Sequence, residues 1–385
     1  MGSFFAFLPR SRSFGVLNFL RGVNMNDQQL MKRALKLAKR ALGRTSPNPV
    51  VGAVIVDKDG NIVGEGYHKK AGLPHAEREA LKAAGEKARG GTMYVTLEPC
   101  CHYGRTPPCT EAIIAAGIKK VVVAVRDPNP KVSGKGIEIL RNAGIEVVEG
   151  VLAEEAFYLN EKFFKFIKTG LPFISLKWAM TVDGKIATET YDSRWVSGEK
   201  SRSFVHRLRN EYDAVLVGAK TLIIDNPLLT CRIPQGRNPY RIVLSGSGNL
   251  PEGLNIFQLE KEKNVLITAS KKLPKHVSNG FGHIVTAPLG ENRINIKEAF
   301  LELSRLGIIS ILVEGGAVVH ASLLQNRLAD KAYIFIAPKI VGGKNAPGPI
   351  GDLKISLMKD ALPLAIHKLR RFGEDVFIEG YFSGG

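Results

Sequence analysis

One histidine, two cysteines and a glutamate are spaced in a way that could support metal chemistry. His75-Ala76-Glu77 precedes a loop that contains Cys100, and Cys109 follows nine residues later. Imidazole and thiolate are donors that Zn²⁺ prefers, and three protein donors leave a fourth position open for water. Zinc lowers the pKa of such a water to about 7, and a carboxylate such as Glu77 can then transfer protons. These residues predict a catalytic zinc site held by His75, Cys100 and Cys109, with Glu77 as the acid/base.

A structural zinc ion is the main alternative to a catalytic one. Structural sites use four protein ligands, and Cys101 or His102 could supply the fourth. The nucleobase deaminases instead use His-x-Glu followed by Pro-Cys and a later Cys, with the glutamate not bound to the metal. The carboxylate favours this catalytic interpretation. His102 is then a better candidate for a substrate contact than for a ligand, and Cys101 has no assigned role.

The flanking sequence predicts the elements that position these donors. Pro74 precedes a predicted helix over residues 75–87, so His75 and Glu77 can converge only in its first turn. A strand over residues 92–96 leads to Cys100, and a helix starts at Cys109. Each cysteine follows a proline. We therefore expect both thiols at helix N-termini, where the pKa of a thiol is lowered.

The other predicted elements complete two α/β domains. The first has helices over 27–42 and 135–143, a hairpin of strands over 50–56 and 62–66, and strands over 120–125 and 145–148. A helix over 153–169 would connect it to the second. The second has strands over 173–178, 214–217, 241–244, 264–268, 308–313 and 331–337, helices over 199–210, 296–306 and 318–325, and a late edge hairpin over 369–371 and 375–381. We expect a three-layer α/β sandwich over 25–149, a connector over 150–170 and a second α/β domain over 171–385.

Composition restricts the class of protein further. Lys and Arg outnumber Asp and Glu by 54 to 36, a formal charge of +18, which suits an anionic partner but is equally explained by a generally basic proteome. Only four cysteines occur, which indicates a reducing compartment rather than a disulfide framework. No run of 18 uncharged apolar residues is present, so we expect no membrane-spanning helix. Residues 1–24 contain phenylalanine and arginine but no acid, which is typical of a targeting segment or of a start codon assigned upstream of Met25. We expect them to be disordered.

The zinc loop resembles that of the bifunctional deaminase–reductase family of riboflavin biosynthesis, which acts on a pyrimidine carrying ribose 5-phosphate. In that family the second cysteine comes nine positions after the first and ends a Gly-Arg-Thr-Pro-Pro-Cys run, as in Gly104–Cys109. The tRNA and small-nucleoside deaminases have Pro-Cys-x-x-Cys instead. Ser46–Pro49, Val51–Val54 and Gly66–Glu77 also match the family. The resemblance implies that Asn48 and His68 line the pyrimidine pocket, and Arg105 is a candidate for binding the ribose phosphate.

The second domain resembles the reductase of the same family, whose fold is similar to dihydrofolate reductase. The segment 173–187, Trp195 with its flanking serines, the segment 221–232 and the segment 313–317 follow the family order, so the resemblance covers residues 25–385. It implies NADPH as cofactor, with neighbours Ala179, Ser193, Trp195, Thr221, Asp225, Ser245, Gly315, Gly316 and Ala317. It also implies substrate contacts from Arg209 and Arg232 to the phosphate and from Glu314 to the ribose hydroxyls. Lys177 and Asp183 are expected to be structural or cofactor-side. Taken alone, Gly315-Gly316 could equally be an ordinary strand–helix turn.

We therefore expect an enzyme with a cytidine-deaminase-like N-terminal domain and a dihydrofolate-reductase-like C-terminal domain. Zinc-dependent hydrolysis of 2,5-diamino-6-(5-phosphoribosylamino)pyrimidin-4-one would be followed by NADPH-dependent reduction of its ribosyl group to ribityl, giving 5-amino-6-(5-phosphoribitylamino)uracil. The alternatives are a nucleic-acid base deaminase, which has no use for the second domain, and a zinc protein that retains only one of the two activities. We expect a cytoplasmic homo-oligomer, a dimer or a tetramer, with no nucleic-acid or membrane partner. Residues 1–24 leave organelle targeting open.

Overall fold

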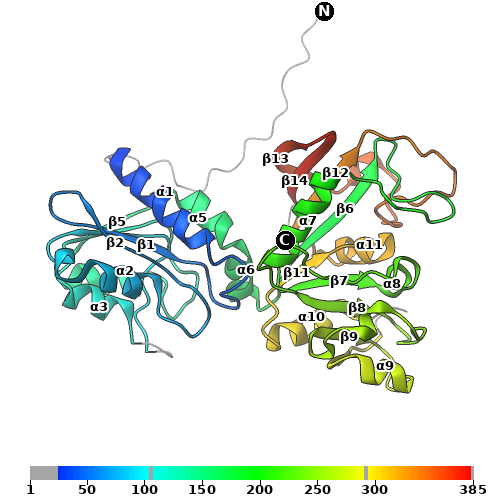
Figure 1. Ribbon diagram of the computed structural model, residues 1–385, viewed down its shortest axis with the longest axis horizontal. Coiled ribbons are helices and arrows are strands. Elements are labelled where there is room, and N and C mark those ends of the chain that lie inside the picture. Colours follow the sequence, from blue (N-terminus) through cyan, green and yellow to red (C-terminus); the bar gives the residue numbers. More distant parts are fainter. Residues whose placement is uncertain (1–24, 104–106, 290–293, 383–385) are drawn as a thin grey trace, which may run out of the picture. The chain divides into compact units, whose positions relative to one another are not determined.

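The computed structural model describes residues 25–103, 107–289 and 294–382 (Figure 1). Contacts divide this part of the chain into two compact units, 25–40 with 50–159 and 41–49 with 160–382. The predicted phosphate contact Arg105 and the expected disorder of residues 1–24 lie outside the described residues. Within them, no helix has the length and apolar character needed to cross a bilayer.

The described part of the first unit contains one five-stranded sheet with the strand order β2-β1-β3-β4-β5. Strands β1 to β3 pair antiparallel around β1, and β3, β4 and β5 are parallel. The strands are β1 Gly52–Val56, β2 Ile62–Tyr67, β3 Thr92–Val95, β4 Lys120–Val123 and β5 Glu146–Glu149. The predicted hairpin of the first two strands is confirmed.

Helices cover both faces of this sheet (Figure 1). Apolar side chains alternate along each strand: Ala53 and Ile55 pack under α2–α4, and Val54 and Val56 pack under α1 and α5. The helices are α1 Met25–Lys39, α2 Ala76–Ala84 with the 3₁₀ turn Gly85–Ala88, α3 Cys109–Ala115, α4 Lys135–Asn142 and α5 Ala153–Leu159. The predicted three-layer sandwich is therefore present.

The connecting segment contains two helices instead of the single helix expected over 153–169. α5 ends at Leu159 and α6 spans Glu161–Thr169. Asn160 between them leaves the helical region, with φ −114° and ψ 16°, and its carbonyl accepts the N–H of Phe164 in the next helix. Asparagine favours such cap positions over helix interiors.

Buried ion pairs attach α6 to the second unit. The Lys331 ammonium lies 2.7 Å from a Glu161 carboxylate oxygen and 2.8 Å from Glu379. The Lys165 ammonium lies 2.5 Å from Asp330, which also accepts the N–H of Ile174. Each buried charge thus has an opposite partner, as burial requires. These pairs explain why the boundary between the units falls at residue 160.

The described part of the second unit contains a nine-stranded sheet with the order β10-β9-β8-β7-β11-β6-β12-β14-β13. In this order the first seven strands, β10 through β12, are all parallel, and β14 and β13 add an antiparallel edge next to β12. The strands are β6 Phe173–Thr181, β7 Ala214–Gly218, β8 Tyr240–Leu244, β9 Asn264–Thr268, β10 His283–Thr286, β11 Ser310–Val313, β12 Lys331–Ala337, β13 Leu364–Phe372 and β14 Asp375–Phe382. The expected edge hairpin is confirmed.

Five α-helices in the described residues cover this sheet, α7–α9 on one face and α10 and α11 on the other. They are α7 Glu199–Glu211, α8 Ala219–Asp225, α9 Lys275–Gly280, α10 Ile296–Arg305 and α11 Ala317–Gln325; the 3₁₀ turns are Asn255–Gln258, Lys261–Lys263 and Met358–Asp360. The sequence did not predict α8, α9 or β10. Each has seven residues or fewer, too few to show a hydrophobic period.

Candidate functional site

The three predicted zinc donors converge in the first unit. Their ligand atoms all lie within 4.8 Å of one another. Nδ1 of His75 is 3.4 Å from Sγ of Cys100 and 3.3 Å from Sγ of Cys109. Zn–S bonds of about 2.3 Å and Zn–N bonds of about 2.0 Å put tetrahedral donors about 3.5 Å apart. The donor set therefore fits a tetrahedral zinc ion with a fourth position open.

Neither candidate for a fourth protein ligand joins this cluster in the described residues. The Cys101 thiol is directed to the Lys131 carbonyl, 3.7 Å away. His102 is exposed. A structural zinc site would need one of them, so the geometry favours the open, catalytic type.

Helix starts position two of the three donors. His75 is the residue before α2, and Cys109 is the first residue of α3. The expectation that Cys100 also begins a helix is wrong, because it lies in the loop after β3. Its sulfur nevertheless accepts the N–H of Cys109 at 3.3 Å, and its carbonyl accepts the same N–H at 3.0 Å. Both sulfurs thus lie at the N-terminus of α3, where the helix dipole favours thiolate.

The electrostatics of the site suit proton transfer. Glu77, in the first turn of α2, is only 3% exposed. Burial raises the pKa of its carboxyl, and charge on Cys100 raises it further. Hydrogen bonds from Cys109 and His75 lower the pKa of the Cys100 thiol, whereas the bond to Cys100, together with burial, raises the pKa of Cys109. A bound cation would deprotonate both thiols. A carboxyl with a raised pKa can both accept and return a proton near neutral pH.

Glu98 anchors the zinc loop, a role that the sequence reasoning missed. Its side chain is 3% exposed and accepts four backbone N–H groups. One oxygen accepts from Asp127 at 3.2 Å and Gly134 at 3.0 Å, and the other from Gly136 at 3.0 Å and Ile137 at 3.3 Å. The last two donors lie in the first turn of α4, where a carboxylate is favoured. The partners are 29 to 39 residues away, so local patterns could not reveal them.

Close packing supports this anchor. A side chain at Gly136 would collide with the carbonyl oxygen of Pro99, which precedes the ligand Cys100. Only glycine lets the start of α4 approach the zinc loop so closely. The loop is thus held by hydrogen bonds and by backbone contact.

Of the two residues expected in the pyrimidine pocket, only His68 belongs to the same unit as the zinc donors. His68 is buried, its ring meets that of His75 edge-on at 5.4 Å, and its Nδ1 lies 3.1 Å from the Pro74 carbonyl. Burial lowers its pKa and favours neutral imidazole. Asn48 belongs by its contacts to the second unit, so it is not placed relative to the zinc donors.

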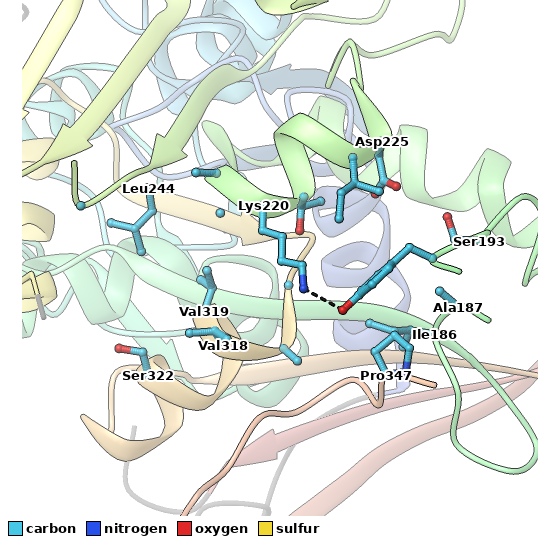
Figure 2. Close-up of a pocket in the computed structure, with 18 of the residues that line it drawn as sticks. Ile186, Ala187, Ser193, Lys220, Asp225, Leu244, Val318, Val319, Ser322 and Pro347 are labelled. Carbon is cyan, nitrogen blue, oxygen red and sulfur yellow. Dashed lines mark hydrogen bonds between the residues drawn. The ribbon is translucent and has the colours of Figure 1, made fainter. Parts of the chain in front are cut away.

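Two adjoining cavities lie in the second unit. The "charged cavity", of about 500 Å³, is lined by Lys177 and several arginines together with most of the predicted reductase residues: Ala179, Ser193, Trp195, Arg209, Thr221, Asp225, Arg232, Glu314, Gly315, Gly316 and Ala317. Figure 2 shows the "apolar cavity", of about 540 Å³. It shares six lining residues with the charged cavity: Ile186, Ser193, Thr221, Asp225, Gly316 and Ala317. We call these six residues the shared wall. The two cavities therefore adjoin along these residues.

Ser245 does not belong to the described lining of either cavity, although Leu244 and Gly246 line the apolar one. Its hydroxyl accepts the N–H of Gly248 at 3.2 Å within its own turn. Asp183 likewise accepts backbone N–H groups, from Val341 and Gly342, as expected for a structural residue.

The glycine pair fits a dinucleotide. Gly315 has φ 141°, which favours glycine, and Gly316 is the residue before α11. A Cβ at Gly316 would lie 3.0 Å from the Thr221 hydroxyl oxygen, so a side chain at this position would fill the space between these two residues. Gly316, Ala317 and Val318, at the start of this nine-residue helix, line the apolar cavity, and the N–H groups of a helix start suit a diphosphate.

Arg209 and Glu314 bind each other. The guanidinium donates to both carboxylate oxygens, at 2.6 and 2.9 Å, and also to the Thr230 carbonyl at 3.0 Å. Both side chains are buried, and the charge of Arg209 keeps the pKa of Glu314 low against the effect of burial. The family resemblance implied that Arg209 binds the phosphate and Glu314 the ribose hydroxyls, whereas in the structure the two side chains form one ion pair.

Lys177 lies beside this pair and was not expected to face substrate. Its ammonium is 3.9 Å from Glu314 and lines the charged cavity. Burial lowers its pKa, an effect that Glu314 opposes. Side chains alternate between the two faces of a strand, so Lys177 and Trp178 on β6 point to opposite faces of the sheet. The sequence alone does not tell which of these faces bears the cavity.

Two family models match the chain. The "Cytidine and deoxycytidylate deaminase zinc-binding region" matches residues 24–125, and the "RibD C-terminal domain" matches residues 172–378. The riboflavin biosynthesis protein RibD of Aquifex aeolicus is 48% identical over 355 residues, covering 91% of this chain and 97% of that protein. The RibD of Escherichia coli is 40% identical over 367 residues, covering 91% and 98%.

Solved structures agree with these matches. A RibD of Acinetobacter baumannii superposes with a TM-score of 0.84 at 37% identity, covering 93% of this chain and 99% of that one. A diaminohydroxyphosphoribosylaminopyrimidine deaminase/5-amino-6-(5-phosphoribosylamino)uracil reductase of Thermotoga maritima superposes with a TM-score of 0.81 at 41% identity, covering 93% and 99%.

Fold, zinc donors and the matched second domain define a zinc-dependent deaminase joined to an NADPH-dependent reductase. The predicted fold class, Zn²⁺ and NADPH are confirmed. The chain belongs to the RibD family of bifunctional riboflavin-biosynthesis enzymes.

Proposed function

We propose that the first unit hydrolyses the 2-amino group of 2,5-diamino-6-(5-phosphoribosylamino)pyrimidin-4-one. Zn²⁺ held by His75, Cys100 and Cys109 would supply a polarised water. The Glu77 carboxylate accepts a proton from the attacking water and donates it to the departing nitrogen, so a C–N bond breaks, a carbonyl forms and ammonia leaves. The convergence of three donors beside the buried Glu77 carries this proposal.

The substrate contacts of this step are part of the proposal. The His68 imidazole, whose lowered pKa favours the neutral form, packs edge-on against the His75 ring and would contact the pyrimidine. Asn48, His102 and Arg105 are proposed as further contacts, the last for the ribose phosphate, on the strength of their place in the sequence motifs.

We propose that the second unit then transfers hydride from NADPH to C1′ of the ribosyl group. The C1′–O4′ bond breaks, O4′ takes up a proton, and the open ribityl chain and NADP⁺ are the products. NADPH supplies the hydride when bound. The shared wall would hold the nicotinamide beside the sugar, with Ala179 and Trp195 on the charged-cavity side. Ser245, beside the lining residues Leu244 and Gly246, is proposed to support the cofactor through its turn.

The charged groups divide into two sets. Arg232 lines the charged cavity and is exposed, so it can bind the substrate phosphate. Arg209 positions Glu314, and Glu314 with Lys177 would contact the ribose hydroxyls. This division replaces the expectation that Arg209 itself binds phosphate.

A two-step assay with Glu77→Gln tests the proposal. The diamino substrate is supplied to zinc-loaded enzyme and ammonia is measured; NADPH is then added and its oxidation is followed. Glu77→Gln should retain zinc and lose deamination by about 10²–10⁴-fold, while still reducing substrate that has already been deaminated. Glu79→Gln, on the same helix and paired with Lys69, is the matched control and should deaminate normally. Ammonia release by Glu77→Gln at the wild-type rate would refute the acid/base role.

We also propose that residues 25–149 form the deaminase domain, 150–170 the connector and 171–385 the reductase domain, and that the chain forms a dimer or tetramer. The edge strand β13 supports assembly, because Ile366 and Leu369 on it are 62% and 66% exposed. Light scattering after gel filtration would test this, and a monomer would contradict it. Four free cysteines support a cytoplasmic location, which fractionation would test. Recovery in an organelle would assign a targeting role to residues 1–24.

A further inference from the structure

The apolar cavity has a single cation among its described lining residues, Lys220 (Figure 2). Asp225 is the single acid among the same described residues; burial raises the pKa of its carboxyl, and the charge of Arg194 opposes this. Most other lining groups are apolar side chains or glycines. NADPH carries a diphosphate and a 2′-phosphate, whose negative charges require cations or N–H donors.

Lys220 is held by an uncharged partner. Its ammonium donates to the Tyr191 hydroxyl at 2.8 Å and lies 4.3 Å from the centre of the same ring. A phenol occupies one of the three ammonium N–H groups and does not neutralise the charge. The ammonium is therefore oriented in the cavity with its positive charge available to an anion.

The position of Lys220 along the cavity fits the phosphates of the cofactor. It precedes Thr221 of the shared wall at the start of α8 and faces the same cavity as the N-terminal residues of α11. The nicotinamide is proposed to lie at the shared wall, so the rest of the cofactor would extend into the apolar cavity past Lys220 and the first residues of α11. We propose that Lys220 binds a phosphate group of NADPH and that Tyr191 orients it. This rests on the NADPH-dependent reduction proposed above.

Binding measurements with Lys220→Met test the proposal independently of turnover. Dissociation constants for NADPH and NADH are measured by cofactor fluorescence, and those for 2′,5′-ADP and ADP by calorimetry. Loss of one charge-assisted contact should weaken NADPH binding about 10- to 100-fold. Lys220→Arg should restore most of the affinity. Lys275→Met, a matched loss of charge on α9 away from either cavity, should bind as wild type does.

The pattern across the probes identifies the phosphate. Weaker binding of NADPH and 2′,5′-ADP, with NADH and ADP unchanged, assigns Lys220 to the 2′-phosphate. Equal weakening of all four assigns it to the diphosphate. Unchanged affinity for every probe would overturn the proposal. Failure of the wild-type enzyme to bind NADPH would refute the proposed reduction instead.

Tyr191→Phe isolates the orienting contact. It removes the hydroxyl that holds the Lys220 ammonium and leaves the ring. The single variant should weaken NADPH binding less than Lys220→Met, and the double variant should be no weaker than Lys220→Met alone. Additive losses would show that Tyr191 acts independently of Lys220.

Discussion

Replacing Glu98 with glutamine is expected to loosen the zinc loop without changing any zinc donor. Glu98 lies two residues before Cys100, and its carboxylate accepts four backbone N–H groups from the loop that leads into α4 and from that helix. Glutamine has nearly the same shape. The substitution therefore tests the hydrogen bonds and not the packing.

The expected cost follows from the division of the four bonds. Each carboxylate oxygen accepts two N–H groups: Gly136 and Ile137 on one, Asp127 and Gly134 on the other. An amide retains one oxygen, so two buried N–H groups lose their acceptor and face an NH₂ group. An unsatisfied buried donor costs about 1–3 kcal/mol. Glu98→Gln should thus lower the free energy of unfolding of the first unit by about 2–6 kcal/mol.

The chain allows the two units to be followed separately in one denaturation experiment. Both tryptophans of the sequence, Trp178 and Trp195, belong to the second unit, so their fluorescence reports its unfolding. A zinc-binding dye reports release of metal from the first. Glu98→Gln should release zinc at a clearly lower denaturant concentration and leave the tryptophan transition in place.

Glu86→Gln is the matched control, because its side chain is 94% exposed. Such a surface change should alter stability by no more than about 0.5 kcal/mol. If both variants released zinc at the wild-type denaturant concentration, Glu98 would not anchor the loop and the reasoning would be wrong.

Three further perturbations address other groups. Arg209→Met removes both hydrogen bonds of the Glu314 carboxylate to its guanidinium partner and leaves only the Lys177 ammonium, 3.9 Å away. It should lower the stability of the second unit by about 3–5 kcal/mol, seen as an earlier tryptophan transition, and an unchanged transition would contradict the pairing. Burial raises the pKa of Asp127 to about 6, so the folded state keeps a proton that the unfolded state has released, and stability falls as pH rises from about 4 to 6. Relative to Asp127→Asn, the wild type should lose up to about 3 kcal/mol across that window, and a constant difference would refute the shift. Zinc chelation should abolish deamination and spare reduction of deaminated substrate, because all three donors lie in the first unit; loss of both activities would show that zinc also supports the second.

Local signals in the sequence were sufficient for the zinc donors. Pro74 and Pro108 mark helix starts, and the donors at or beside those starts are brought together by the predicted α/β sandwich. The long periodic elements were predicted to within a few residues. The break at Asn160 was not, because a single polar residue between two apolar stretches does not distinguish a helix cap from an exposed helix position.

Interactions between distant residues could not be read from the sequence. Arg209 and Glu314 are 105 residues apart, and each alone resembles a substrate-binding residue. Only the order of the strands brings them together. The same is true of Glu98, whose four partners lie on a loop and a helix beyond two further elements of the chain. A charged side chain inside a motif can thus bind another group of the same chain instead of a substrate or cofactor.

The segment 41–49 has a consequence for how the gene could be divided. Its neighbours in sequence, α1 and β1, belong to the first unit, whereas its contacts belong to the second: a side chain at Gly43 would collide with the Asn210 carbonyl, and Arg44 donates to the carbonyl of Gln235. The backbone therefore passes between the units three times. A deaminase fragment ending near residue 159 would retain this segment but lose its packing partners. Domain exchange between relatives would therefore have to keep residues 41–49 matched both to the second unit, on which they pack, and to the deaminase, for which Asn48 is a proposed pyrimidine contact.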